Sequence, residues 1–130
     1  MIYIIPGLGD KKYNFPKNVK YLHLSMDDVL SLPKLPKGST LIGFSIGAII
    51  AYLLSLKFPV KKLILCSPSP IIMKYKKPKS EVHVLTGDKE DIQMQKYAIA
   101  LARKLGATLT KVNSPHKMTR NYRKAILDTI

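Results

Sequence analysis

Short apolar runs alternate with longer helix-like stretches along this chain, and the alternation restricts the folds open to it. Runs typical of buried strands occupy residues 2–5, 19–24, 40–44, 62–66, 82–86 and 109–112. Helix-like patterns occupy residues 27–32, 46–56 and 91–105, and a last one starts near Thr119. Alternating strands and helices predict an α/β fold, with a mostly parallel sheet of about six strands and helices on both faces.

Three local patterns refine this prediction. The stretch 46–56 is apolar on nearly all sides, which is typical of a core helix, whereas 91–105 has apolar residues at helical spacing and a natural stop at Gly106. Prolines at 68, 70 and 78 predict a loop between the fourth and fifth strands.

Length and composition indicate one domain, residues 1–130, with 46% hydrophobic residues. The longest apolar stretch is too short to span a bilayer, and the N-terminus shows no basic leader or cleavage site. The single cysteine, Cys66, excludes an internal disulfide and has no metal-ligand spacing around it. We therefore expect a cytoplasmic protein with no metal and no cofactor.

The net charge of +14 raises the question of an anionic partner. All but three of the 22 basic residues are lysine, with the densest group at Lys74, Lys76, Lys77 and Lys79. The chain lacks an aromatic-interleaved basic motif or a recognisable nucleic-acid module. A lysine-rich solvated surface is favoured over nucleic-acid binding.

The run Gly43-Phe44-Ser45-Ile46-Gly47 joins the predicted strand 40–44 to the predicted helix 46–56. A serine hydroxyl is a weak nucleophile that needs an exposed position, a nearby base and donors for an oxyanion. A sharp strand-to-helix turn provides the exposure, and its crowding requires small residues two positions before and after the serine. The alternative is an ordinary glycine-containing turn with a solvated serine.

Other reactive residues also follow predicted strand ends. Pro6-Gly7-Leu8-Gly9 follows the first strand, His116 follows the sixth, and three carboxylates follow the fifth: Asp88, Glu90 and Asp91. The carboxyl ends of parallel strands meet at one edge of a sheet, where ligands bind. A nucleophile, an acid and a histidine at that edge form the set that acyl transfer requires. His23 and His83 lie inside predicted strands and are better explained as structural residues.

These landmarks give the chain a resemblance to the alpha/beta-hydrolase superfamily over nearly its whole length, as a minimal member. The quoted segments correspond to the family's oxyanion loop (4–9), nucleophile elbow (43–47), acid turn (85–91) and histidine loop (114–116). The order serine, acid, histidine is also the family's order. Only residues 67–80 separate the fourth and fifth strands, which is too short for the lid domain of larger members. The four clustered lysines are expected on the rim of an open site.

The resemblance implies a serine hydrolase acting on an ester or thioester. Ser45 would be the nucleophile, His116 the base, and the backbone N–H groups of Leu8 and Ile46 the oxyanion donors. The family's acid position corresponds to Glu90; Asp91, one residue later, is the second choice and is equally plausible as a helix N-cap, while Asp88 suits a turn.

The substrate would be a small acyl compound. The basic surface makes an anionic acyl compound one of the candidates. Two other functions stay open: a non-catalytic binding module on a hydrolase scaffold, and a basic protein that binds anionic partners.

Overall fold

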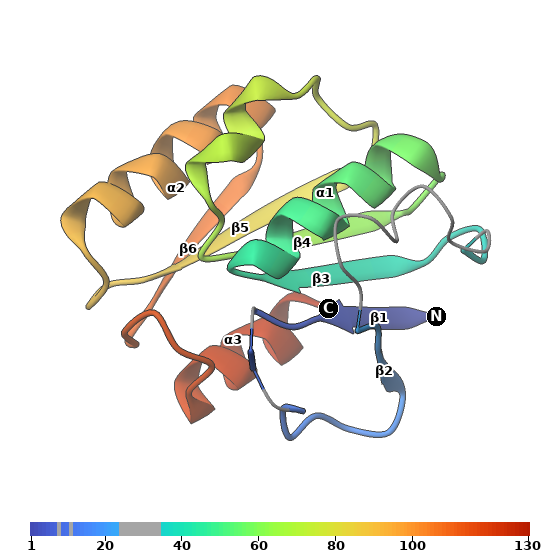
Figure 1. Cartoon of the computed structure of the whole chain (residues 1–130), viewed down its shortest axis with the longest axis horizontal. Helices are drawn as coiled ribbons and strands as arrows, with labels where there is room; N and C mark the ends of the chain where they lie inside the picture. Colours follow the sequence, from blue (N-terminus) through green and yellow to red (C-terminus); the bar gives the residue numbers. More distant parts are fainter. Residues whose placement is uncertain (8, 11, 24–34) are drawn as a thin grey trace.

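The computed structural model describes all residues except 8, 11 and 24–34 (Figure 1). The described strands and helices follow one another as β1 (Ile2–Ile5), β2 (Val19–Tyr21), β3 (Thr40–Phe44), α1 (Ile46–Lys57), β4 (Lys62–Cys66), the 3-10 helix η2 (Pro70–Lys74), β5 (Glu81–Gly87), α2 (Ile92–Leu105), β6 (Thr108–Val112) and α3 (Arg120–Thr129). The helix predicted at 27–32 lies outside the described residues.

The six strands form one sheet in the order β2-β1-β3-β4-β5-β6, and every neighbouring pair is parallel. The predicted α/β fold is confirmed. The chain starts at β1, adds β2 on one side, and then continues with β3 on the other side of β1. The order of strands therefore reverses between β1 and β3, and in such sheets the carboxyl ends of the two strands at the reversal frame the ligand crevice.

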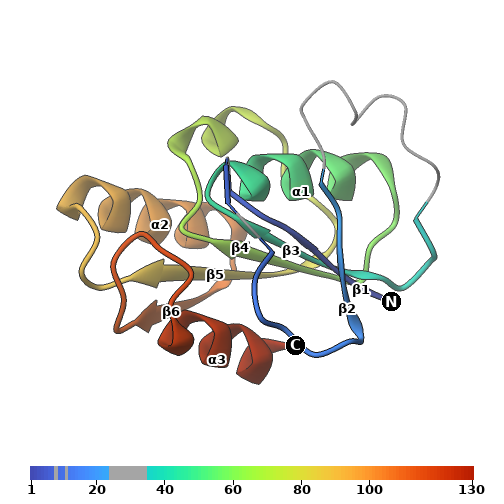
Figure 2. The same ribbon diagram turned by 60° about the horizontal axis from the view of Figure 1, so that its bottom comes forward.

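Helices cover both faces of the sheet, as predicted. Figure 2 shows α1 and α2 on one face and α3 on the other. On the first face, α1 and α2 pack with the sheet in a core that includes Leu63, Val84 and Leu101. On the second face, Tyr122 and Ile126 of α3 pack against Ile64 and other strand residues. Because α1 is itself largely buried, with Ala48, Ala51 and Leu54 fully enclosed, its sequence can be apolar nearly all round.

Two predicted segments differ from the structure by more than one residue. The second strand ends at Tyr21 rather than at residue 24, because it is an edge strand that pairs only with β1. The predicted loop 67–80 contains η2, whose first residue is Pro70. Proline suits the first position of a helix because its fixed φ is already helical and the N–H it lacks would have no partner there.

Candidate active site

The carboxyl ends of four strands bring the predicted site residues to one edge of the sheet. Ser45 follows β3, Glu90 follows β5, and His116 follows β6, while Pro6 and Gly7 follow β1. Ser45 thus lies where the strand order reverses, and β4 separates β3 from β5 in the sheet.

Ser45 occupies a sharp turn between β3 and α1. Its backbone angles, φ 59° and ψ −119°, belong to a region that L-residues rarely adopt. The turn is crowded: a side chain on Gly47 would collide with the backbone carbonyl of Ile5, and one on Gly43 with that of Gly47. The Ser45 N–H donates to the Cys66 carbonyl at 2.9 Å, which fixes the turn to β4.

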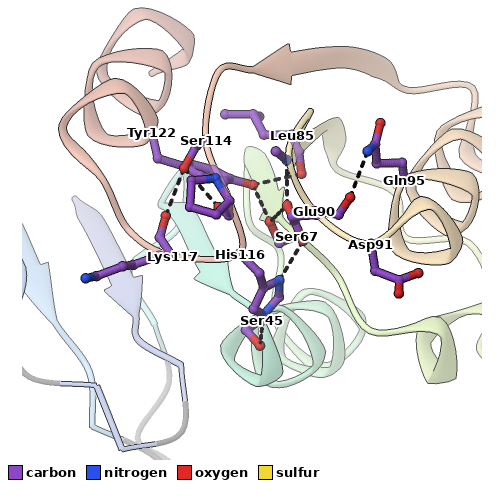
Figure 3. A network of polar contacts seen from close by, with 12 residues as sticks. Ser45, Ser67, Leu85, Glu90, Asp91, Gln95, Ser114, His116, Lys117 and Tyr122 are labelled. Atoms are coloured by element: carbon purple, nitrogen blue, oxygen red, sulfur yellow. Dashed lines mark hydrogen bonds and ion pairs between the residues drawn. The ribbon is translucent and has the colours of Figure 1, made fainter.

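His116 connects Ser45 to Glu90 (Figure 3). Its Nε2 lies 2.9 Å from Ser45 Oγ, and its Nδ1 lies 2.6 Å from Glu90 Oε1. The loop that carries His116 is held by Ser114, whose buried hydroxyl donates to the Pro115 carbonyl at 2.9 Å and lies 2.8 Å from Thr119 Oγ1. We call this hydrogen-bonded arrangement the Ser45–His116–Glu90 series.

The Glu90 carboxylate is enclosed and fully bonded. Its side chain has no exposed surface, and Oε2 accepts from the Ser67 hydroxyl and the Gly87 N–H, each at 2.5 Å. Burial opposes ionisation of Glu90, but the hydrogen bonds from His116, Ser67 and Gly87 outweigh it and lower the pKa. The hydrogen bond to Glu90 in turn raises the pKa of His116 above its ordinary value, against the opposing effect of partial burial.

The other two candidate carboxylates lie away from His116. Asp91 caps α2, accepting from the Gln93 N–H at 2.8 Å, and Figure 3 shows its side chain pointing away from the imidazole. Asp88 is exposed in the turn after β5. Of the three, the structure brings only Glu90 to His116.

Comparison with solved structures places this geometry in a known fold. The chain matches two variants of Arabidopsis thaliana SOBER1. The first variant matches with a TM-score of 0.61 and 13% identity, over 98% of this chain and 96% of that one. The second variant matches with a TM-score of 0.58 and 14% identity, over 98% of this chain and 95% of that one. The chain has an alpha/beta-hydrolase fold. Esterase PE8 also matches, with a TM-score of 0.51 and 24% identity. This match includes 74% of this chain and 52% of that protein.

These identities establish the fold alone. No protein-family model and no curated protein matches the sequence. The resemblance inferred from the sequence is confirmed at the level of the alpha/beta-hydrolase fold.

Of the two predicted oxyanion donors, the structure describes only Ile46. Leu8 lies outside the described residues. Ile46 is the first residue of α1. The N–H groups of the first helical turn, including that of Ile46, have no acceptor within the helix. The Gly7 N–H is already engaged, since it donates to the Tyr13 hydroxyl at 3.0 Å.

Two residues beneath the site were missed by the sequence analysis. Ser67, the first residue after β4, is 1% exposed, has a positive φ of 46° and donates to Glu90. Tyr122 of α3 lies 2.8 Å from the Ser67 hydroxyl and donates to the Leu85 carbonyl at 3.0 Å. Ser67 could have been found, because it follows a strand end as the other candidates do. Tyr122 gave no such indication.

Two hollows flank the Ser45 hydroxyl and the His116 ring. The smaller, of about 280 Å³, is lined by the apolar side chains of Ile46, Ile49, Pro70 and Met94, together with Ser67 and Ser69. The larger, of about 500 Å³, lies on the side of Gly7 and Phe44 and carries Asp10, Lys12, Lys117 and Arg123. We call them the apolar hollow and the basic cleft.

The lysine group expected on the rim of the site lies mostly elsewhere. Lys76, Lys77 and Lys79 line a separate depression together with Ser55, Val60 and Ser80, near the amino ends of β4 and β5. That is the edge of the sheet opposite to Ser45. The prediction was wrong because segment 67–80 runs from the carboxyl end of β4 back to the start of β5.

The remaining histidines belong to other parts of the surface. His83 bonds Glu81 at 2.8 Å and Thr108 at 2.6 Å near the start of β5, which fits the structural role expected for it. His23 lies beyond the end of β2, exposed, with its ring stacked on that of Tyr21.

Within the described residues, no three His, Cys, Asp or Glu side chains are grouped as metal ligands would be. None of the helices there combines the length and apolar character needed to cross a bilayer.

Proposed function

We propose that the chain is a serine hydrolase that cleaves a carboxylic ester or thioester through an acyl-enzyme on Ser45. The observation that carries the proposal is the Ser45–His116–Glu90 series, with contacts of 2.9 and 2.6 Å from the two nitrogens of one imidazole. The name of one structural neighbour, esterase PE8, agrees with this activity.

In the first half-reaction, Ser45 Oγ attacks the substrate carbonyl while His116 Nε2 accepts the hydroxyl proton. Glu90 holds the imidazole with Nδ1–H directed at its carboxylate and stabilises the imidazolium that forms. The tetrahedral oxyanion accepts a hydrogen bond from the Ile46 N–H, aided by the positive end of the α1 dipole, and from the Leu8 N–H. His116 then gives its proton to the departing alcohol or thiol.

In the second half-reaction, water attacks the Ser45 ester with His116 again as the base. The proton passes to Ser45 Oγ as the acid product leaves, which restores the free enzyme. Losing one oxyanion donor in such a site costs about 3 kcal/mol of transition-state stabilisation.

The apolar hollow suits a short acyl or alkyl group. At about 280 Å³, it is at the lower end of the size range of small-molecule pockets. We therefore expect short-chain esters to be better substrates than long-chain ones.

The test combines a fluorophosphonate probe with a chain-length series of p-nitrophenyl esters. Wild type is expected to be labelled at Ser45 and to hydrolyse the short esters; Ser45→Ala should lose both properties while keeping its fold by circular dichroism. His116→Ala should lose about 10⁴-fold or more in kcat/KM. Unlabelled wild type whose ester turnover equals that of Ser45→Ala would overturn the proposal.

A further inference from the structure

The two hollows beside Ser45 differ in charge. The apolar hollow contains no lysine, arginine or carboxylate among its described lining residues. Among its described lining residues, the basic cleft has three cationic side chains, those of Lys12, Lys117 and Arg123, against one carboxylate, that of Asp10. A substrate that occupies both hollows while its scissile bond lies at Ser45 would therefore experience a positive field on one side only.

The Asp10 carboxylate of the basic cleft already has a partner. Tyr13 donates its hydroxyl to Asp10, and the same hydroxyl accepts from the Gly7 N–H. The hydrogen bond from Tyr13 holds the Asp10 carboxylate against its own loop. The same side chain also lies close to the backbone of Gly7. Asp10 pairs with none of the three cations.

The three cations have no carboxylate partner among the described residues, where the ion pairs involve Lys62, His83 and His116. Lys12 lies over the Tyr21 ring, with Nζ 5.3 Å from its centroid, and Arg123 donates from Nη1 to the Met118 carbonyl at 3.4 Å. Both contacts leave N–H groups available, because an ammonium has three and a guanidinium five. Figure 3 shows Lys117 pointing away from the polar network around Glu90.

Lys117 is next to His116 in the sequence, so its ammonium lies on the same loop as the proposed base. Arg123 comes from α3 and Lys12 from the loop after β1. Three separate segments thus direct positive charge toward one cleft that also contains Ser45 and His116. Convergence of cations from several elements beside a reactive centre favours an anionic group on the ligand.

We propose that the basic cleft binds a carboxylate or phosphate group of the substrate. The substrate class is then an ester or thioester with a short apolar part on one side of the scissile bond and an acidic part on the other. This inference rests on the proposed hydrolase function and specifies its substrate.

Two substrate pairs locate the acidic part. The first pair places it on the leaving group: 4-acetoxybenzoate against the neutral 4-acetoxybenzamide, which has no second ester bond. The second places it on the acyl group: mono-p-nitrophenyl adipate against p-nitrophenyl hexanoate. In each pair the ratio of kcat/KM for the anionic to the neutral ester is measured, after subtraction of the uncatalysed rate. We expect a ratio clearly above one in one pair.

Charge variants test whether the basic cleft causes the preference. Lys117→Gln, Lys12→Gln and Arg123→Gln should each lower the ratio by about two- to fivefold, the effect of one partly exposed charge. Asp10→Asn should raise it. Lys79→Gln is the matched control, because it removes an equal charge at the opposite edge of the sheet and should leave the ratio unchanged. Lys12 and Lys117 are exposed, so the test does not depend on whether Arg123→Gln folds.

The outcomes separate the two proposals. Hydrolysis of neutral esters with ratios at or below one in both pairs overturns the anion site and leaves the hydrolase proposal standing. An equal fall in the ratio for Lys79→Gln attributes the preference to overall charge and also overturns the site. Absence of Ser45-dependent turnover with all four esters overturns the hydrolase function itself.

Discussion

At the scale of single residues, Glu90 and Asp91 are adjacent carboxylates with different environments. Glu90 is buried and bonded to His116, Ser67 and the Gly87 N–H. Asp91 is exposed and caps α2. The sequence left open which of the two orients His116, because both lie in one short turn and only the direction of the side chains distinguishes them.

The first prediction compares Glu90→Gln with Asp91→Asn. Glu90→Gln removes the charge that raises the pKa of His116, so kcat/KM should fall by about 10³- to 10⁴-fold. The base must be neutral, so wild-type activity rises with pH through the raised pKa of His116 and levels off above it. In Glu90→Gln this midpoint should move to lower pH.

Asp91→Asn is the control for this comparison. Asparagine also caps helices well, so activity, midpoint and thermal stability should stay close to wild type. A larger loss of kcat/KM in Asp91→Asn than in Glu90→Gln would contradict the geometric assignment. The pH–rate profiles of the three proteins measure both effects.

The second prediction concerns Ser67, which touches Glu90 rather than the reacting atoms. Ser67→Ala removes one hydrogen bond from the carboxylate, and a bond to a charged group is worth about 1.5–3 kcal/mol. We expect kcat to fall by about tenfold with little change in KM, and the pH midpoint to shift because the pKa of Glu90 rises. Tyr122→Phe should have a smaller effect, since its hydroxyl reaches Glu90 only through Ser67.

Ser55→Ala is the control for Ser67→Ala, because Ser55 is also a buried serine. Its hydroxyl donates to the Tyr52 carbonyl at 2.6 Å within α1. This variant should lose stability without moving the pH–rate midpoint. An unchanged midpoint in Ser67→Ala would show that Ser67 has only a structural role.

At the scale of elements, the turn from β3 to α1 holds Ser45 in a strained conformation. A non-glycine residue at such angles costs about 1–3 kcal/mol, and crowded glycines at 43 and 47 surround it. The strain positions the hydroxyl at the carboxyl edge of the sheet, next to His116. Stability is thereby given up at the residue proposed as the nucleophile.

The third prediction follows from this strain. Ser45→Gly should abolish ester hydrolysis and raise the free energy of unfolding relative to Ser45→Ala, by about 1–2 kcal/mol in urea denaturation. Ser69→Gly is the control: Ser69 has an ordinary φ of −72°, so glycine there should only destabilise relative to Ser69→Ala. The same sign of change at both positions would argue against strain at Ser45.

The elements differ in how well the sequence predicted them. The strands at 40–44 and 62–66 were predicted to the residue, because buried parallel strands are short apolar runs between clear turn residues. The edge strand β2 was predicted too long, because it pairs with a neighbouring strand on one side only, that of β1. The 3-10 helix η2 was read as loop because Pro70, its first residue, is typical both of loops and of the first turn of a helix. Tyr122 could be recognised only once the fold had brought α3 against the sheet, whereas Ser67 directly follows the end of β4 and could have been predicted from the sequence.

At the scale of the whole molecule, the sheet topology and the charge act on the same site. The order reversal between β1 and β3 creates the crevice in which Ser45 lies, and the basic cleft occupies the β1 side of that crevice. The charge of +14 reflects 22 basic residues against eight acidic ones, and among the described residues Lys62 pairs with Glu81. The excess positive charge therefore repels itself across the folded surface while it attracts anions.

The fourth prediction uses salt to separate these two consequences. Raising NaCl from 20 to 300 mM shortens the Debye length from about 20 to about 6 Å, which screens repulsion between lysines. The melting temperature should rise by about 3–6 °C, corresponding to roughly 1 kcal/mol. The same change should lower kcat/KM for the preferred anionic ester and leave that for its neutral partner nearly constant, because screening weakens steering only where the substrate is charged.

A variant with Lys74, Lys76, Lys77 and Lys79 all changed to glutamine completes this test. It lowers the net charge from +14 to +10, since four lysines are removed, so its melting temperature should depend less on salt. Three of those lysines line the depression at the far edge of the sheet, so its salt-dependent preference for the anionic ester should persist. A melting temperature that falls with salt in wild type would mean that attractive pairs outweigh repulsion, and would contradict the prediction.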